Sequence, residues 1–384
     1  MRLTPLLLSA ACALAACAHA PTPTADPQSV LVDRLFGTPT EAVSTDDVFA
    51  MSAAMRRYVA VDIADALRVD GKQAGLLEAL RERAKLKLEY DAARTKNAAE
   101  TFADRTGNCL SLVIMSAAFA KSLDLPVSYR AAYLDEPWSR NGNLLVATGH
   151  VNITVGRRII DAKTARDLAP ITIDFLPPEE IGGLRSREID EATIVAMYAN
   201  NRAAEALAAG RLNDAYAWSA ESVRRDPTFN AAFNTLGVVY LRHGDLDEAA
   251  RVFERVLAVE PKDTRILSNL AETYAQQGRK ADEQAIRQRL VAIEPYPPFH
   301  FFNLGLEAMK QGDYAKARDL FAREVARSDS NHEFQFWLGV ADWRLGDEAA
   351  AQRHLRLALD NSVTRSQHDL YAAKLAWLQA HRVH

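Results

Sequence analysis

The most regular feature of the chain is a hydrophobic pattern that recurs through its C-terminal half. Between residues 196 and 365, apolar residues return at the three- and four-residue spacing of one helix face. Glycine interrupts the pattern every 34 residues, at Gly210, Gly244, Gly278, Gly312 and Gly346. Two amphipathic stretches separated by glycine predict a helix–turn–helix unit, and such units must stack on one another to bury their apolar faces.

Positions inside this period are equally regular. If the units begin at residues 196, 230, 264, 298 and 332, position 8 always carries a small residue: Ala203, Gly237, Ala271, Gly305 and Gly339. Position 24 is bulky at Phe253, Phe321 and Leu355, and Pro227, Pro261 and Pro295 end three units because proline stops a helix. The pattern resembles the tetratricopeptide repeat family. The resemblance implies an all-α solenoid over 196–365, and the apolar spacing of 366–384 predicts a helix that caps it.

In this family the concave face is lined by positions 2, 5, 6, 9 and 12 of each first helix, and it binds a protein or peptide. In the fourth and fifth units these positions are aromatic, which predicts a partner-binding groove at Phe299, Phe302, Phe336, Trp337 and Trp343. Buried aromatic anchors dominate binding energy in protein interfaces. The alternative is that the N-terminal domain or the capping helix covers these residues as internal core.

A different pattern marks residues 46–195. The sequence Gly107-Asn108-Cys109 is followed by a continuous apolar run to Ala120. Asn108 is a favourable N-cap, so the run predicts a buried helix with Cys109 in its first turn. Free backbone N–H groups and the helix dipole at that position favour a thiolate. Residues 125–133 predict a strand that follows this helix.

Strict alternation from His150 to Val155 predicts a second strand, with Val151, Ile153 and Val155 on its core face. Gly156-Arg157 predicts a two-residue turn, which places residue 155 opposite 158 and residue 150 opposite 163. In that register His150 and Asp161 are neighbours on one face, within reach of a histidine–carboxylate hydrogen bond.

The order cysteine, histidine, aspartate on these elements resembles the transglutaminase-like superfamily. The resemblance implies an α+β, papain-like domain over 46–195, with its core at about 85–165 and a catalytic triad of Cys109, His150 and Asp161. It also implies thiol-dependent acyl chemistry on peptide or side-chain amides, in which hydrolysis is favoured over crosslinking because water is always available as acceptor. A non-catalytic adaptor that acts only through its repeats is the alternative.

The N-terminus predicts export. Met1-Arg2 and a short apolar run to Ala16 form a signal peptide over residues 1–16. Leu14-Ala15-Ala16-Cys17 resembles the bacterial lipobox, which implies cleavage and lipidation at Cys17. Cleavage after Ala20 by ordinary signal peptidase is the alternative. The Pro- and Thr-rich composition of 17–45 predicts a flexible tether. Because Ala follows Cys17, the sequence resembles lipoproteins sorted to the outer membrane, where the protein would face the periplasm.

Charge and motifs exclude several other functions. Lys and Arg number 46 against 50 Asp and Glu, for a net charge of −4, so no nucleic-acid partner is expected. The sequence has no His-x-x-x-His pair, no Cys-x-x-Cys pair and no glycine-rich phosphate loop, so we expect neither a metal nor a cofactor. If Cys12 is removed and Cys17 is lipidated, Cys109 is the one remaining thiol and no internal disulfide forms.

Overall fold

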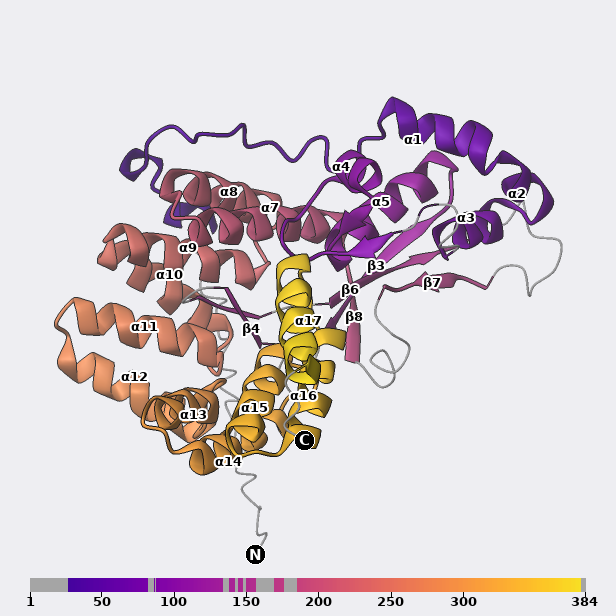
Figure 1. Ribbon diagram of the computed structural model, residues 1–384. Helices are drawn as coiled ribbons and strands as arrows, with labels where there is room; N and C mark the ends of the chain where they lie inside the picture. Colours follow the sequence, from indigo (N-terminus) through magenta and orange to yellow (C-terminus); the bar gives the residue numbers. More distant parts are fainter. Residues whose placement is uncertain are drawn as a thin grey trace, which may run out of the picture.

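The computed structural model describes residues 27–81, 86, 88–133, 138–141, 144–147, 150–156, 169–175 and 185–380. An N-terminal α+β domain is followed by a curved stack of helices that ends beside that domain (Figure 1). The N-terminal helices are η1 Pro27–Val30, η2 Asp33–Leu35, α1 Ala53–Arg57, η3 Tyr58–Asp62, α2 Ala64–Val69, α3 Lys72–Arg81, α4 Ala98–Asp104 and α5 Cys109–Ser122. The strands are β1 Glu89–Tyr90, β2 Thr106–Gly107, β3 Val127–Tyr133, β4 Trp138–Asn141, β5 Leu144–Ala147, β6 His150–Val155, β7 Ile171–Ile173 and β8 Arg185–Ile189.

The centre of the N-terminal domain is helix α5 packed against an antiparallel sheet. Among the described residues the sheet has the order β7-β6-β3-β8. The apolar run of α5 is buried on all sides, and Ile114, Phe119 and Ile153 are each fully inaccessible in the core between helix and sheet. The predicted helix after Asn108, the strand near 125–133 and the core face of β6 are therefore confirmed.

The predicted register of the strand after His150 is wrong. Val155 pairs with Ile171 on one side and with Val127 on the other, so both edges of β6 at this point are occupied. The neighbour of β6 on that edge is therefore β7, and residues 158–163, to which the predicted register refers, lie outside the described residues. Asp161 lies outside the described residues.

Residues 191–380 form the helical stack. Its helices are α7 Glu191–Ala208, α8 Leu212–Arg225, α9 Asn230–His243, α10 Leu246–Val259, α11 Thr264–Gln276, α12 Lys280–Ile293, α13 His300–Lys310, α14 Tyr314–Val325, α15 His332–Arg344, α16 Glu348–Asp360 and α17 Arg365–Ala380. The five predicted helix pairs and the terminal helix are confirmed. Each periodic glycine lies in the turn inside a pair with φ between 72° and 98°, the left-handed region that favours glycine.

The small residue at position 8 lies where the two helices of a unit touch. A Cβ atom added to Gly237 would lie 2.4 Å from Cε1 of Phe253, the bulky residue at position 24. Gly305 has the same relation to Phe321, at 2.5 Å. The two sequence positions are therefore coupled by direct packing.

Residues 28–46, here called the strap, are docked on the first repeats and do not form the predicted flexible tether. Tyr240 Oη donates to the carbonyl of Val30 at 2.8 Å and accepts from the N–H of Val32 at 3.0 Å. Phe36 stacks on Tyr216 with ring centroids 4.0 Å apart. The indigo segment of Figure 1 follows this path along α8. The part of the predicted tether at 17–26 lies outside the described residues.

The end of the stack returns to the N-terminal domain. The N–H of Ala92 donates to the carbonyl of Val363, just before α17, at 2.9 Å. In Figure 1 the yellow helix α17 accordingly begins beside the N-terminal domain. Together with the packing of α7 on α5, this contact attaches both ends of the stack to the same domain.

Candidate functional site

Cys109 is the first residue of α5, as predicted. The side chain of the N-cap Asn108 accepts a hydrogen bond from the N–H of Ser111, which starts the helix at this point. Cys109 is a free thiol and is 9% exposed. The first backbone N–H groups of a helix have no acceptor within the helix, and they therefore favour negative charge near this position.

His150, the first residue of β6, lies within hydrogen-bonding reach of Cys109, the first residue of α5. Its Nε2 atom is 2.7 Å from Oδ1 of Asp174, one residue beyond β7. Both side chains are deeply buried, at 2% and 7% exposure. Since Nε2 is engaged by Asp174, the nitrogen left for the sulfur of Cys109 is Nδ1.

Asn152, the next residue of β6 on the same face as His150, binds the same carboxylate. Its Nδ2 donates to Oδ2 of Asp174 at 2.8 Å, so the two oxygens of Asp174 are bound by two residues of one strand face. The ladder explains the contact: Ile153 pairs with Ile173, which brings residue 174 opposite Asn152. His150 is then the diagonal neighbour.

The charges around His150 favour its protonated form. Burial lowers the pKa of the imidazole, but hydrogen bonds and charge from Asp174 and Cys109 raise it more, from 6.5 to about 9. At neutral pH the ring therefore carries two N–H donors, one for the carboxylate and one for the sulfur. Such a pair can stabilise a thiolate and can deliver a proton to a leaving group.

Sequence reasoning missed Asp174. The structure brings Cys109 and His150 together, and the carboxylate it places against the histidine is Asp174, 24 residues further along the chain. A signal for it exists, because Ile171-Thr172-Ile173 alternates as a short strand and ends at an aspartate.

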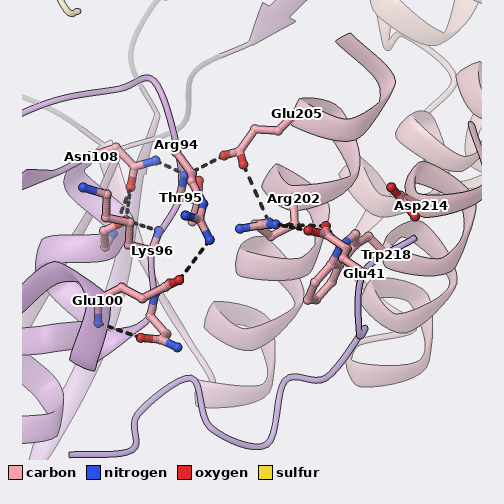
Figure 2. A network of polar contacts seen from close by, with 12 residues as sticks. Glu41, Arg94, Thr95, Lys96, Glu100, Asn108, Arg202, Glu205, Asp214 and Trp218 are labelled. Carbon is pink, nitrogen blue, oxygen red and sulfur yellow. Dashed lines mark hydrogen bonds and ion pairs between the residues drawn. The ribbon is translucent and has the colours of Figure 1, made fainter. Parts of the chain in front are cut away.

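A second network connects this site to the repeats (Figure 2). Nδ2 of Asn108 donates to Oγ1 of Thr95 at 2.8 Å, and the N–H of Thr95 donates to Oε1 of Glu205 on α7 at 2.6 Å. Glu205 lies 3.7 Å from Nε of Arg202, which binds both oxygens of Glu41 in the strap.

The predicted aromatic groove is wrong at Phe299 and Phe302. They are 1% and 0% exposed and pack with Phe321 and Phe334 in the core that the fourth and fifth units share. The buried carboxylate of Glu324 fixes the start of α13, since it accepts from the N–H of Phe299 at 2.8 Å and from that of Phe301 at 3.2 Å.

The remaining three aromatics differ from one another. Phe336 is half-buried and stacks on Tyr371 of α17 at 5.0 Å, so the capping helix covers it. Trp337 is half-buried and packs toward Phe321. Trp343 is 37% exposed and meets Trp377 edge-on. The internal-core alternative thus describes most of the predicted groove.

The first helices of the second and third units present polar residues on their predicted concave positions. Nδ2 of Asn269 donates to Oδ1 of Asn234 at 2.8 Å, across the boundary between the two units. Both residues are half-buried, Ser268 is exposed, and Asn303 is exposed on the next unit. This row is the polar part of the face that the repeats share.

Comparison with known proteins identifies the stack. Residues 234–296 and 302–362 match the tetratricopeptide repeat family model. The helix pairs within these ranges are tetratricopeptide repeats. Such repeats are associated with protein–protein interaction, which agrees with the predicted class of partner. No curated protein matches the chain.

Several solved structures are similar to about half of the chain. A thermophilic tetratricopeptide repeat protein of Thermus thermophilus is 17% identical, covers 47% of this chain and 99% of its own, and has a TM-score of 0.30. YrrB, described as having an unusual peptide-binding site, is 20% identical with coverages of 47% and 92% and a TM-score of 0.25. Pseudomonas aeruginosa pilF is 18% identical with coverages of 50% and 86% and a TM-score of 0.29.

Within the ranges given above, no three or more His, Cys, Asp or Glu side chains gather in a way that could hold a metal ion. In the same ranges, none of the helices has both the length and the apolar character that crossing a bilayer requires.

Proposed function

We propose that this protein is an adaptor that binds an extended peptide segment of a partner on the concave face of its tetratricopeptide repeats. The observation that carries the proposal is the polar row of Asn234 and Asn269 on the second and third units. A carboxamide has two donor hydrogens and two acceptor positions, so the bond between these residues leaves further groups for a ligand. A peptide backbone has the same donors and acceptors.

The buried state of Phe299 and Phe302 moves the proposed site away from the fourth unit. Those rings are internal core, so a partner cannot reach them without opening that unit. The polar row is accessible and lies between neighbouring units, where one bound strand would contact both. The proposal therefore favours main-chain recognition over insertion of apolar anchors.

The test is selection of binding peptides from a random displayed library, followed by calorimetric Kd measurement on wild type and variants. We expect Asn234→Ala with Asn269→Ala to weaken binding by at least about tenfold, the effect of two lost hydrogen bonds. Gln284→Ala with Gln288→Ala is the matched control, because it removes two exposed carboxamides from α12, the second helix of its unit. Equal affinity in the asparagine and glutamine variants would contradict the proposal.

A second candidate is thiol chemistry of the transglutaminase-like type, which the contact between His150 and Asp174 favours. Cys109 Sγ would attack the carbonyl carbon of an amide, and His150 would protonate the departing nitrogen as the C–N bond breaks. Water would then attack the thioester, release the carboxylic acid and return the thiol. Asp174 would hold the imidazole, in the role that the sequence assigned to Asp161.

Alkylation kinetics separate the two aspartates. Iodoacetamide should modify wild-type Cys109 rapidly at neutral pH, and His150→Ala or Asp174→Ala should slow the reaction about tenfold or more. Asp161→Ala is the control that should leave the rate unchanged. A rate that is insensitive to His150 would remove this candidate and leave the adaptor alone.

We also propose that the protein is exported and lipid-anchored at Cys17, on the outer membrane facing the periplasm. The motif Leu14-Ala15-Ala16-Cys17 supports this proposal. Wild-type protein should enter the detergent phase on partitioning, and Cys17→Ser should accumulate as an unlipidated precursor. A mature, unlipidated protein that begins at Pro21 would contradict it.

A further inference from the structure

The loop of residues 91–97 lies directly beside the start of the cysteine helix. It follows β1, whose residues Glu89 and Tyr90 pair in parallel with Thr106 and Gly107. Gly107 is followed by Asn108 and Cys109, so the loop departs from the same point at which the cysteine helix begins. Movement of the 91–97 loop would therefore be transmitted to that helix.

The 91–97 loop fixes the N-cap of the helix through two buried hydrogen bonds, and a third bond inside the first turn joins their two ends. Asn108 Nδ2 donates to Thr95 Oγ1 at 2.8 Å, and the N–H of Lys96 donates to Ser111 Oγ at 2.8 Å. Ser111 Oγ in turn donates to Oδ1 of Asn108 at 2.8 Å. Both ends of the Asn108 carboxamide are thus held, and with them the direction of the first turn.

The loop itself is held by a carboxylate from the repeats. The N–H of Thr95 donates to Oε1 of Glu205 at 2.6 Å, and Thr95 is only 1% exposed. A buried backbone N–H that loses its acceptor is strongly unfavourable, so the loop would have to move if Glu205 were absent. Figure 2 shows Glu205 reaching from α7 toward Thr95.

Glu205 is in turn kept in place by charge. Arg202, 7% exposed, lies between Glu205 and Glu41 of the strap, and its Nη2 atom is 2.9 Å from each oxygen of Glu41. Trp218 Nε1 donates to the same carboxylate at 2.6 Å. A buried guanidinium with two carboxylate partners restricts the position of both.

We infer that Glu205 is a positioning residue for the Cys109 site: through Thr95 and Asn108 it holds the cysteine helix in the orientation that brings the sulfur to His150. The inference rests on the thiol chemistry proposed above. It makes the first repeat a structural component of the reactive site, in addition to its place in the binding stack.

The test measures how much His150 accelerates alkylation of Cys109 by iodoacetamide. The readout is the ratio of the rate with His150 to the rate with His150→Ala, taken in each background by intact-mass spectrometry. Because both rates are measured in the same background, a change in the access of iodoacetamide to the sulfur affects both and does not alter the ratio. We expect Glu205→Ala to lower the ratio about tenfold, the effect of one lost charge-assisted hydrogen bond. Glu205→Gln should retain most of the ratio because its amide oxygen still accepts from Thr95.

Glu221→Ala is the matched control. Glu221 is a glutamate of α8 that accepts from Thr45 at 2.6 Å, so it links the first repeat to the strap and not to the 91–97 loop. Its ratio should equal that of wild type. Thr95→Val, which removes the acceptor for Asn108, should lower the ratio, and Thr95→Ser should restore it. The threonine variants report on the same path if Glu205→Ala does not fold.

The outcomes distinguish the inference from the function on which it rests. A wild-type ratio of one would remove the thiol chemistry, and the inference with it, before any Glu205 variant is made. A large wild-type ratio that Glu205→Ala and Thr95→Val leave unchanged would overturn the inference alone. Equal losses in Glu205→Gln and Glu205→Ala would also overturn it, because the charge next to Arg202 would then matter and the bond to Thr95 would not.

Discussion

The packing of Gly237 against Phe253 allows a quantitative test of the repeat geometry. In Gly237→Ala the new Cβ would lie 2.4, 2.7 and 2.9 Å from three atoms of the Phe253 ring. Carbon atoms in contact normally lie about 3.5–4.0 Å apart, so the ring or the helix must move by about 1 Å. Phe253 is fully buried, so the ring cannot turn out into solvent without opening the core.

Two effects of opposite sign set the magnitude. Overpacking a well-filled core costs about 1–3 kcal/mol, and the required shift places this substitution in the upper half of that range. Alanine in a helix interior is about 1 kcal/mol more favourable than glycine, and Gly237 lies inside α9. The clash therefore wins, with a net loss of about 1–2 kcal/mol. At about 2–4 °C per kcal/mol for a domain of this size, Tm should fall by about 2–8 °C.

Urea denaturation followed by far-ultraviolet circular dichroism measures this loss, with Gly339→Ala as the matched control. A Cβ at Gly339 has its nearest neighbours at 3.1, 3.2 and 3.3 Å, and its partner at position 24 is Leu355. Gly339→Ala should therefore lower the stability less than Gly237→Ala does. In the double variant Gly237→Ala with Phe253→Leu, the two effects should partly cancel. Equal stabilisation by both single glycine substitutions would refute the reasoning.

Three further predictions follow from other contacts. Phe36→Ala should lower the free energy of unfolding by about 1–2 kcal/mol, because a half-buried ring leaves Tyr216; unchanged urea unfolding would show that the strap is not docked in solution. Phe302→Ala should lower the free energy of unfolding by about 3–5 kcal/mol, as for any buried phenylalanine. A loss below about 1 kcal/mol would show that Phe302 is not core and would support the predicted groove. Burial lowers the pKa of His150, but Asp174 and Cys109 raise it overall from 6.5 to about 9, so its stabilising contribution is complete below pH 6.5 and is lost as pH rises through about 9. The stability difference between wild type and His150→Gln should shrink across that interval, and a constant difference would contradict the assignment.

Local signals in the sequence were enough for the repeats and the cysteine helix. Gly210 and its periodic equivalents need a left-handed turn, and Asn108 needs only its own helix to act as a cap. These requirements involve residues a few positions apart. The sequence therefore predicts them without knowledge of the tertiary structure.

The errors all come from tertiary contacts. A glycine turn after Val155 predicts a hairpin, but β3 and β7 occupy both edges of β6, so the carboxylate against His150 comes from Asp174. Composition predicts a free tether, but Phe36 has a ring to stack on in Tyr216. Phe299 fails as a concave-face residue because α13 begins at His300, which leaves Phe299 outside the helix at φ 63°.

The hydrogen bond between Ala92 and Val363 constrains the number of repeats, which is not constrained in an open stack. Open solenoids tolerate the gain or loss of a whole unit, because each unit touches only its neighbours. Here an inserted unit would displace Val363 from Ala92 by roughly two helix spacings of 8–10 Å each. Five units are therefore the number at which the stack can meet the N-terminal domain again, just as the strand number determines whether a β-barrel closes. Duplication of a unit would break the contact between Ala92 and Val363.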